Sequence, residues 1–230
     1  MIDPAKLSLS SFLSSPRFND YLDRCGHDSI RAARLYAWNH EIAGTFLGPL
    51  AILEIAMRNA MNSALSSQFG PDWISDPNSC DLLSDDRKKF EDTASRIKSQ
   101  KGRTASNDQI VASSSFGDWV RLLDSGHARD KRLNYEKTLW EPALQHAFPN
   151  REGMGRKELH GNLNSLRSFR NRVVHHEPIH QRNHKNLIDE IVNMVELIDR
   201  DAAILIREGN GVLGSVASRG ASLKDGDCCI

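Results

Sequence analysis

The sequence predicts an all-α protein, and three observations support this prediction. Apolar residues recur every three or four positions along most of the chain, as they do on one face of an α-helix. No two alternating segments are joined by a two-residue hairpin turn. Apolar residues make up 39% of the 230 residues and charged residues 26%, which is typical of a soluble chain with a buried core. We therefore expect a helical bundle.

The N-terminal part is expected to form one short helix and two long ones. Ser15-Pro16 is typical of a helix start, and Cys25-Gly26 of a helix end. A second helix is expected over residues 28–47, where Gly48-Pro49 should end it because proline cannot donate the helical hydrogen bond. The third helix should end just before Phe69. Its apolar stripe consists of Leu50, Leu53, Met57, Met61, Ala64 and Leu65.

Five further helices are expected after a loop at residues 75–84. They cover residues 85–99, 107–123, 135–148, 156–176 and 186–208. The remaining residues are rich in glycine, serine and alanine and have no apolar stripe. We therefore expect residues 1–209 to form a single domain and residues 210–230 to form a flexible C-terminal tail.

The net charge and the cysteine spacing exclude some classes of protein. Lysine plus arginine and aspartate plus glutamate each number 30, so the formal net charge is zero. This argues against a polybasic protein whose whole surface binds nucleic acid, although it leaves room for a local basic site. The four cysteines have no zinc-type spacing, and we expect reduced thiols in a cytosolic protein. They are Cys25, Cys80, Cys228 and Cys229.

The sequence offers no sign of export or membrane insertion. The N-terminus has neither the basic nor the apolar region of a signal peptide. The most apolar stretch, residues 42–57, contains Pro49 and Glu54 and is shorter than the roughly 20 residues that span a bilayer. We expect a cytoplasmic protein with no membrane partner.

The segment around residues 166–179 is the most informative part of the sequence. On a helix, the stripe of leucines that ends at Val173 also contains Arg170, and a buried guanidinium needs an acidic or phosphate partner. Arginine, amide and imidazole groups on one helix can bind a phosphodiester and transfer protons near neutral pH. The other face carries Asn164, Ser168, Asn171, Arg172, His175 and His176.

Local charge makes this region the best candidate for an anionic ligand. Residues 151–186 contain eight lysines and arginines, three acidic residues and five histidines, in a chain of zero net charge. A purely structural interpretation stays open. In that interpretation the histidines interact with the C-terminal end of a helix dipole, and the arginines pair with a neighbouring glutamate.

A second candidate site lies in the third expected helix. Glu54 falls inside the apolar stripe, and Arg58 follows it at the spacing that favours an ion pair. The pair is either a partly buried structural contact or a means of orienting Arg170 or a histidine. Because an unpaired buried carboxylate is costly, we expect Glu54 to be buried and to meet Arg58 or Arg170.

A metal site is a further alternative. His176, His180 and His184 are spaced four residues apart, and on an unbroken helix they would form a ladder of ligands. Pro178 disfavours helical geometry at Glu177 and should disrupt this ladder. We therefore expect no metal and no other cofactor. No phosphate-binding glycine loop or nucleophile elbow is present, and no local signature supports a catalytic triad.

These motifs resemble a known family. The stretch from Arg170 to His175 fits the R-x4–6-H motif of the HEPN superfamily of small α-helical ribonucleases, and RNRVVHHEPI resembles its abortive-infection (Abi-like) branch. Other matching pieces occur in the same order over residues 50–180. They are LEIAMRN at 53–59, IV at 110–111 with SFGDW at 115–119, LWE at 139–141 and AFP at 147–149. This chain has serines at 113–115 where the family often has an acidic residue or threonine.

The resemblance implies a HEPN-like helical bundle with additional helices, a homodimer, and metal-independent cleavage of RNA to a 2′,3′-cyclic phosphate. It also implies a bacterial role in phage defence or in a toxin–antitoxin system, where an RNA or protein antitoxin would be a partner. By motif position, Arg170 and His175 are the expected catalytic pair. The supporting residues would be Asn171, Arg172, His176, Glu54 and Arg58.

One geometric difficulty accompanies this assignment. Arg170 and His175 lie five positions apart, or about 140° around an ideal helix, so they would not share a face. Either the helix unwinds before Pro178, or a two-fold dimer brings Arg170 of one subunit to His175 of the other. Whether His175 or His176 transfers the proton stays open. The rival functions are a non-catalytic RNA- or partner-binding module and a metal-dependent hydrolase.

Overall fold

The computed structural model describes residues 3–6 and 13–228 of the chain. The protein is all-α: 69% of it is helical, and the described residues form no strand beyond one isolated bridge between Gly126 and Asn134. In chain order the elements are η1 (Pro4–Lys6), α1 (Ser15–Arg24), α2 (Ser29–Phe69), α3 (Ser84–Lys101), α4 (Asn107–Ser113), α5 (Phe116–Arg121), the π-helical turn η3 (Glu136–Trp140), η4 (Leu144–Ala147), α6 (Arg156–Val174), α7 (His184–Glu196), α8 (Arg200–Gly209) and α9 (Val212–Asp225).

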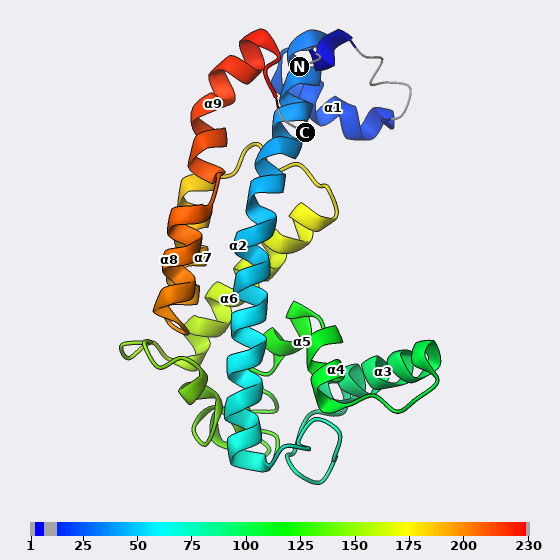
Figure 1. The fold of residues 1–230 in the computed structure, drawn as a ribbon, viewed down its shortest axis with the longest axis vertical. Coiled ribbons are helices and arrows are strands. Elements are labelled where there is room, and N and C mark those ends of the chain that lie inside the picture. The colour runs from blue at the N-terminus through cyan, green and yellow to red at the C-terminus, as the bar shows by residue number, and fades with distance from the viewer. Residues whose placement is uncertain (1–2, 7–12, 229–230) are drawn as a thin grey trace. The chain divides into compact units, whose positions relative to one another are not determined.

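Helix α2 is a single helix of 41 residues, so the predicted break at Gly48-Pro49 is wrong (Figure 1). The reason is the spacing of the buried residues. Phe46, Leu50 and Leu53 continue one stripe through the dipeptide without a change of phase, and each is at most 3% exposed. Burial of this stripe outweighs the hydrogen bond that Pro49 cannot donate.

The predicted helix 107–123 is two helices, because serines 114 and 115 interrupt it. The hydroxyl of Ser115 accepts a hydrogen bond from Asp118 N, and Asp118 Oδ2 accepts one from Ser115 N, which forms a capping box at the start of α5. Ser114 ends α4 by bonding back to the carbonyl of Ile110. Its Oγ also accepts a hydrogen bond from Trp119 Nε1 at 3.0 Å.

Two other predicted helices are also divided. Residues 135–148 contain the turns η3 and η4 rather than one α-helix, and Pro142 lies between them. The predicted helix 186–208 is split into α7 and α8, because Asp199 caps a new helix by accepting a hydrogen bond from Ala202 N at 2.8 Å. In both places a capping side chain or a proline interrupts the helix, although the apolar periodicity continues.

Helix α9 occupies most of the stretch that the sequence predicted as a flexible tail. Val212 and Ser222 are fully buried, and the carbonyl of Ser215 accepts a hydrogen bond from Trp38 Nε1 at 2.8 Å. The small residues of this helix allow close packing, so no wide apolar stripe is needed. Residues 229 and 230, which include Cys229, lie outside the described part of the chain.

The contacts divide the chain into two compact units. The first consists of residues up to 50, residues 169–190 and residues from 206 on; the second consists of residues 51–168 and 191–205. In the core of the first unit, Phe46 meets Phe169 edge to face at 4.9 Å between ring centroids. The edge-to-face contact of Trp38 with His184 at 5.5 Å lies in the same core.

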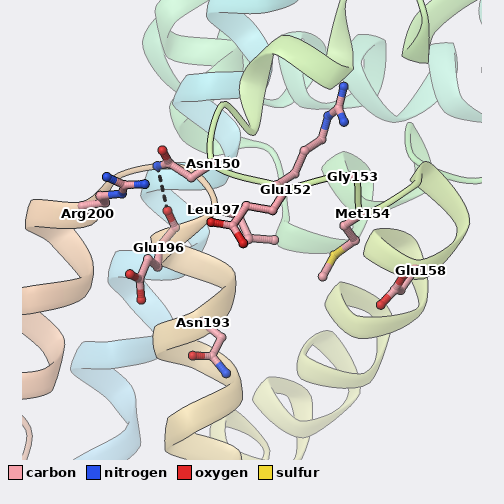
Figure 2. A pocket seen from close by; sticks show the side chains of 10 residues that line it. Asn150, Glu152, Gly153, Met154, Glu158, Asn193, Glu196, Leu197 and Arg200 are labelled. Atoms are coloured by element: carbon pink, nitrogen blue, oxygen red, sulfur yellow. Dashed lines mark hydrogen bonds between the residues drawn. The ribbon is translucent and has the colours of Figure 1, made fainter.

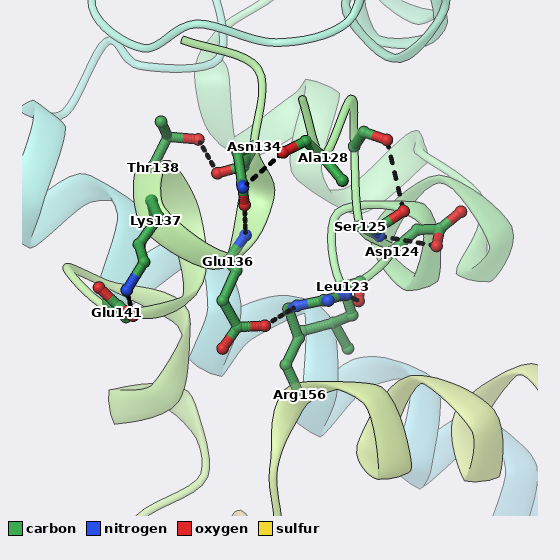
Figure 3. A network of polar contacts seen from close by, with 11 residues as sticks. Leu123, Asp124, Ser125, Ala128, Asn134, Glu136, Lys137, Thr138, Glu141 and Arg156 are labelled. Carbon is green, nitrogen blue, oxygen red and sulfur yellow. Dashed lines mark hydrogen bonds and ion pairs between the residues drawn. The ribbon is translucent and has the colours of Figure 1, made fainter. Parts of the chain in front are cut away.

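The second unit is centred on three aromatic rings, those of Trp73, Phe90 and Trp119, whose centroids lie 5.7–6.0 Å apart. A polar network in this unit fixes the start of α6 (Figure 3). Arg156 donates hydrogen bonds to the carbonyl of Leu123 at 2.7 Å and to the carboxylate of Glu136 at 2.6 Å. Since the arginine side chain is mostly buried, this pair anchors α6 firmly.

Among the described helices, α2 is long and apolar enough to pass a length-and-composition test for a membrane span. A core helix of a soluble protein passes the same test, and Ile42, Phe46, Leu53 and Met57 of α2 are all buried inside the protein. The structure is therefore compatible with a soluble protein. Among the described cysteines, Cys25, Cys80 and Cys228 are free thiols.

Candidate functional site

The predicted motif lies at the C-terminal end of α6, within the first unit. The helix ends at Val174, two residues earlier than expected, in a Schellman turn. His176 N donates to the carbonyl of Val173 at 3.1 Å, and Glu177 N donates to the carbonyl of Arg172 at 2.8 Å. His176 has a φ of +57°, the left-handed position that glycine usually occupies.

This turn exposes two adjacent imidazoles. His175 and His176 are both exposed, while Val173 beside them is buried. His175 N still bonds to the carbonyl of Asn171 at 2.9 Å, so its backbone continues the helical path. The chain changes direction at His176. The unwinding that the sequence allowed therefore redirects His176 and leaves His175 on the helical path.

Arg17 of α1 holds the turn from outside the motif. One guanidinium nitrogen, Nη2, lies 3.3 Å from the carbonyl oxygens of both His175 and His176. These two carbonyls have no partner within the helix, because α6 ends here. Arg17 thus satisfies the end of α6 and adds a positive charge to the turn.

A third imidazole, that of His40 in α2, approaches the turn. Its ring centroid lies 6.1 Å from that of His176 and 4.5 Å from that of Tyr36. Burial lowers the pKa of His40, and the neighbouring His176 and Arg17 side chains lower it further. His40 is therefore neutral at pH 7 and able to accept a proton.

The arginines of the motif differ in their surroundings. Arg172 forms an ion pair with Glu177 at 3.2 Å and donates to the carbonyl of Pro178 at 2.9 Å, so it braces the chain after the turn. Arg170 and Asn171 are half-buried. Because His175 stays on the helical path, Arg170 and His175 remain about 140° apart around α6.

A buried polar layer lies behind the turn. Asn39, which is 1% exposed, accepts hydrogen bonds through Oδ1 from the backbone N of Ile179 and of His180, at 2.8 and 3.0 Å. The ring of His184 contacts the carbonyl of Ile179 at 2.9 Å. Burial lowers the pKa of both His180 and His184. These side chains fix the path of residues 179–184 and so position the turn.

The ladder of His176, His180 and His184, which Pro178 was expected to disrupt, does not form on one helix. Residues 175–183 are not helical, so His176 is separated from His180 and His184 by the turn. Across the described parts of the chain, no three histidine, cysteine, aspartate or glutamate side chains gather in a way that could hold a metal ion. The guanidinium groups at the turn suit an anion better than a cation.

Glu54 and Arg58, the other predicted site residues, belong to the second unit. Glu54 is half-buried, although the sequence predicted burial. Arg58 is also half-buried and donates to the carbonyl of Ala112 at 2.9 Å. The pairing of Glu54 with Arg58 or Arg170 stays a prediction, and so does its supporting role.

The sequence reasoning missed Arg17 and His40. Neither residue stands in a recognisable motif, and they lie 158 and 136 positions before His175 and His176 respectively. His40 follows the buried residues Trp38 and Asn39. The only feature of the sequence that could have indicated His40 was therefore an imidazole next to an apolar stripe. That signal does not indicate which distant residue the imidazole meets.

Two cavities of about 540 Å³ lie in the second unit, away from these residues. One is shown in Figure 2, where residues 150–158 face the end of α7 and Arg200 at the start of α8. Its lining mixes Glu152, Glu158 and Glu196 with two arginines. This mixed charge favours no single class of ligand.

Comparisons with protein-family models, with curated proteins and with solved structures found no match for this chain.

Proposed function

We propose that the protein is a metal-independent endoribonuclease of the HEPN type that cleaves RNA to a 2′,3′-cyclic phosphate. The observation that carries the proposal is the turn after α6. It exposes His175 and His176 beside Arg17 and places His176 near the neutral imidazole of His40. RNA supplies the phosphodiester that such a cationic, proton-transferring site would recognise.

The proposed reaction needs one proton acceptor, one proton donor and a cation. A neutral imidazole takes the proton of the 2′-hydroxyl, and the 2′-oxygen forms a bond to the adjacent phosphorus. The bond from phosphorus to the 5′-oxygen breaks, and a protonated imidazole gives that oxygen a proton. The products are a 2′,3′-cyclic phosphate and a free 5′-hydroxyl. Arginine stabilises the negative charge on the phosphoryl oxygens.

Within this proposal His175 and Arg170 are the catalytic pair by motif position. Asn171, Arg172 and His176 support them, and Glu54 and Arg58 keep the supporting roles expected from the resemblance. His40 is the residue that the structure adds, because its ring lies near His176 and its lowered pKa keeps it in the neutral form that accepts a proton. His176 is the imidazole nearest to it at the turn, with 6.1 Å between the two ring centroids.

The biological setting follows from the resemblance. An RNA-cleaving toxin of a bacterial abortive-infection or toxin–antitoxin system acts in the cytoplasm, and an RNA or protein antitoxin restrains it. A non-catalytic RNA- or partner-binding module in the same setting is the alternative function. It predicts retained binding and retained biological effect when the catalytic histidine is replaced.

The test is cleavage of a mixed-sequence RNA by the purified protein in the presence of EDTA. We expect cleavage with 2′,3′-cyclic phosphate ends. His175→Ala and Arg170→Ala should each reduce the rate by about 100-fold or more, the usual effect of removing a general acid, a general base or a charge-stabilising group. His40→Gln should reduce it by about tenfold or more, with the larger loss near neutral pH.

His127→Gln is the matched control, because His127 is an exposed histidine of the second unit. Its rate should equal that of the unmodified protein. Circular dichroism should confirm that every variant keeps its helical content. Full cleavage by folded His175→Ala or Arg170→Ala would disprove the catalytic assignment, and loss of cleavage in EDTA would favour a metal-dependent hydrolase.

A further inference from the structure

A pocket of about 410 Å³ in the first unit is lined by four arginines. Its volume falls within the range of about 300–1,000 Å³ that small-molecule sites usually have. The guanidinium groups come from four separate segments: Arg24 from the end of α1, Arg31 from the start of α2, Arg182 from the segment before α7, and Arg219 from α9. The fold therefore brings together cations that are far apart in the sequence.

None of these four arginines has a carboxylate within ion-pair distance among the described residues, and no acidic side chain lines the pocket. Two other arginines of the same unit are paired with a carboxylate. Arg34 meets Asp3 at 2.6 Å, and Arg172 meets Glu177 at 3.2 Å. Four unpaired guanidiniums around one pocket repel one another, and a bound anion would relieve that repulsion.

The four side chains are exposed, so a ligand can reach them. Arg24 donates one hydrogen bond to the side-chain oxygen of Gln181. The guanidinium of Arg219 lies 4.8 Å from the centre of the Trp38 ring, a cation–π contact that orients it. Each guanidinium has five N–H donors, and these contacts use few of them.

The wall of the pocket adds a buried imidazole and apolar surface. His180 is 2% exposed, and its Nδ1 is buried without a hydrogen-bond partner in the described part of the chain. Its Nε2 lies 3.7 Å from Asp20 Oδ2. Leu35 and Leu223 supply apolar contact beside the arginines. The pocket thus combines a cationic part with an apolar part.

We propose that this arginine pocket binds the phosphate groups of a nucleotide, either a free nucleoside triphosphate or the 5′-phosphorylated end of an RNA strand. One guanidinium group can donate two parallel hydrogen bonds to two oxygens of the same phosphate. Lysine lacks this geometry, so arginine has an advantage over lysine at phosphate sites. Leu223, the partly exposed leucine of the lining, contacts the sugar or base. Binding here does not require RNA cleavage, so the proposal stands or falls independently of the ribonuclease activity.

The test is calorimetric titration of the full-length protein with two pairs of probes. One pair is ATP and adenosine; the other is one 2′-O-methyl RNA oligonucleotide with and without a 5′-phosphate. The methylated RNA cannot be cleaved by attack of its 2′-oxygen. We expect the phosphorylated member of at least one pair to bind about tenfold or more tightly than its partner. Binding of ATP identifies a free nucleotide, and binding of the phosphorylated RNA alone identifies a strand end.

Arg31→Gln/Arg182→Gln should weaken binding of the preferred probe by about tenfold or more, since it removes two guanidiniums. The matched control is Arg103→Gln/Arg129→Gln, which removes two exposed arginines of the second unit. It should change the affinity by less than about twofold. If Arg31→Gln/Arg182→Gln fails to fold, the single variant Arg219→Gln replaces it, and it too should weaken binding of the preferred probe. No discrimination in either pair, or equal loss in both double variants, would overturn the proposal.

Discussion

His176 occupies a backbone conformation that is costly for any residue with a side chain. Its φ of +57° places it at the position of a Schellman turn where glycine is the usual residue. The left-handed conformation costs a non-glycine residue roughly 1–2 kcal/mol. Strain of this kind tends to occur at functional sites, which fits the exposed imidazole and its approach to His40.

Replacing His176 with glycine should therefore raise stability while it lowers activity. We expect His176→Gly to raise the free energy of unfolding by up to about 1 kcal/mol, because the strain is removed. RNA cleavage should fall, because the imidazole is lost. The matched control is His175→Gly, which should lower stability, since His175 continues the helical path of α6. Urea unfolding measures both variants, and a destabilised His176→Gly would contradict the account of strain.

The buried histidines predict how stability depends on pH. Burial, and secondarily the charge of Arg219, lowers the pKa of His184 below the value of about 6.5 in an unfolded chain. Below pH 6.5 the unfolded state therefore binds more protons, and the free energy of unfolding should decrease as the pH falls toward the folded-state pKa. His40 and His180 shift in the same direction, so each contributes part of this loss.

The measurement is urea unfolding of His184→Gln at several pH values between 8 and 5. The variant should lose less stability than the unmodified protein over the interval below pH 6.5, because one of the buried titrating groups is gone. His127→Gln should keep the original dependence, since that side chain is exposed. The prediction is wrong if His184→Gln and the unmodified protein lose stability equally.

At the scale of elements, capping side chains decide where the helices begin and end. The capping box of Ser115 and Asp118 starts α5, and that of Ser106 and Gln109 starts α4. Asp199 separates α8 from α7 in the same manner. Apolar periodicity alone does not detect these boundaries, because the buried stripe continues on either side of the cap.

Ser115→Ala should lower the free energy of unfolding by about 1 kcal/mol, the usual cost of losing an N-cap side chain. Ser113→Ala is the matched control, because Ser113 is an exposed serine at the C-terminal end of α4. It should change stability by less than about 0.5 kcal/mol. Chemical unfolding measures the stability of both variants. Equal changes in the free energy of unfolding would mean that the capping box does not stabilise the protein.

At the scale of the whole molecule, the separation of Arg170 and His175 favours a homodimer. Both residues remain on the path of α6, about 140° apart, so one subunit does not place them on one face. A two-fold axis near residues 170–176 would bring Arg170 of one subunit toward His175 of the other. We therefore predict a homodimer with this segment near the interface.

Mixing two inactive variants tests this prediction. If each site combines Arg170 and His175 from different subunits, a heterodimer of Arg170→Ala and His175→Ala has one intact site. Random exchange of subunits should then restore about a quarter of the full cleavage activity. Light scattering should also show a dimer at the concentration of the assay. A monomer with full activity, or no recovery on mixing, would rule out the shared site.

The sequence by itself determined the all-α class, the helical motif segment with its buried stripe, and the local excess of positive charge around residues 151–186. These properties depend on periodicity, composition and short spacings, which a sequence displays directly. Its resemblance to HEPN ribonucleases also named Arg170 and His175 as candidates. The same local information failed at Pro49 and in α9, where packing against distant residues such as Trp38 decides the conformation.

Only the tertiary structure decided which distant side chains meet. It brought Arg17 and His40 to the turn of His176, and it gathered four arginines from separate segments around one pocket. The physical reason is that these features depend on long-range packing and on the satisfaction of buried polar groups, and neither is encoded in any short stretch of sequence.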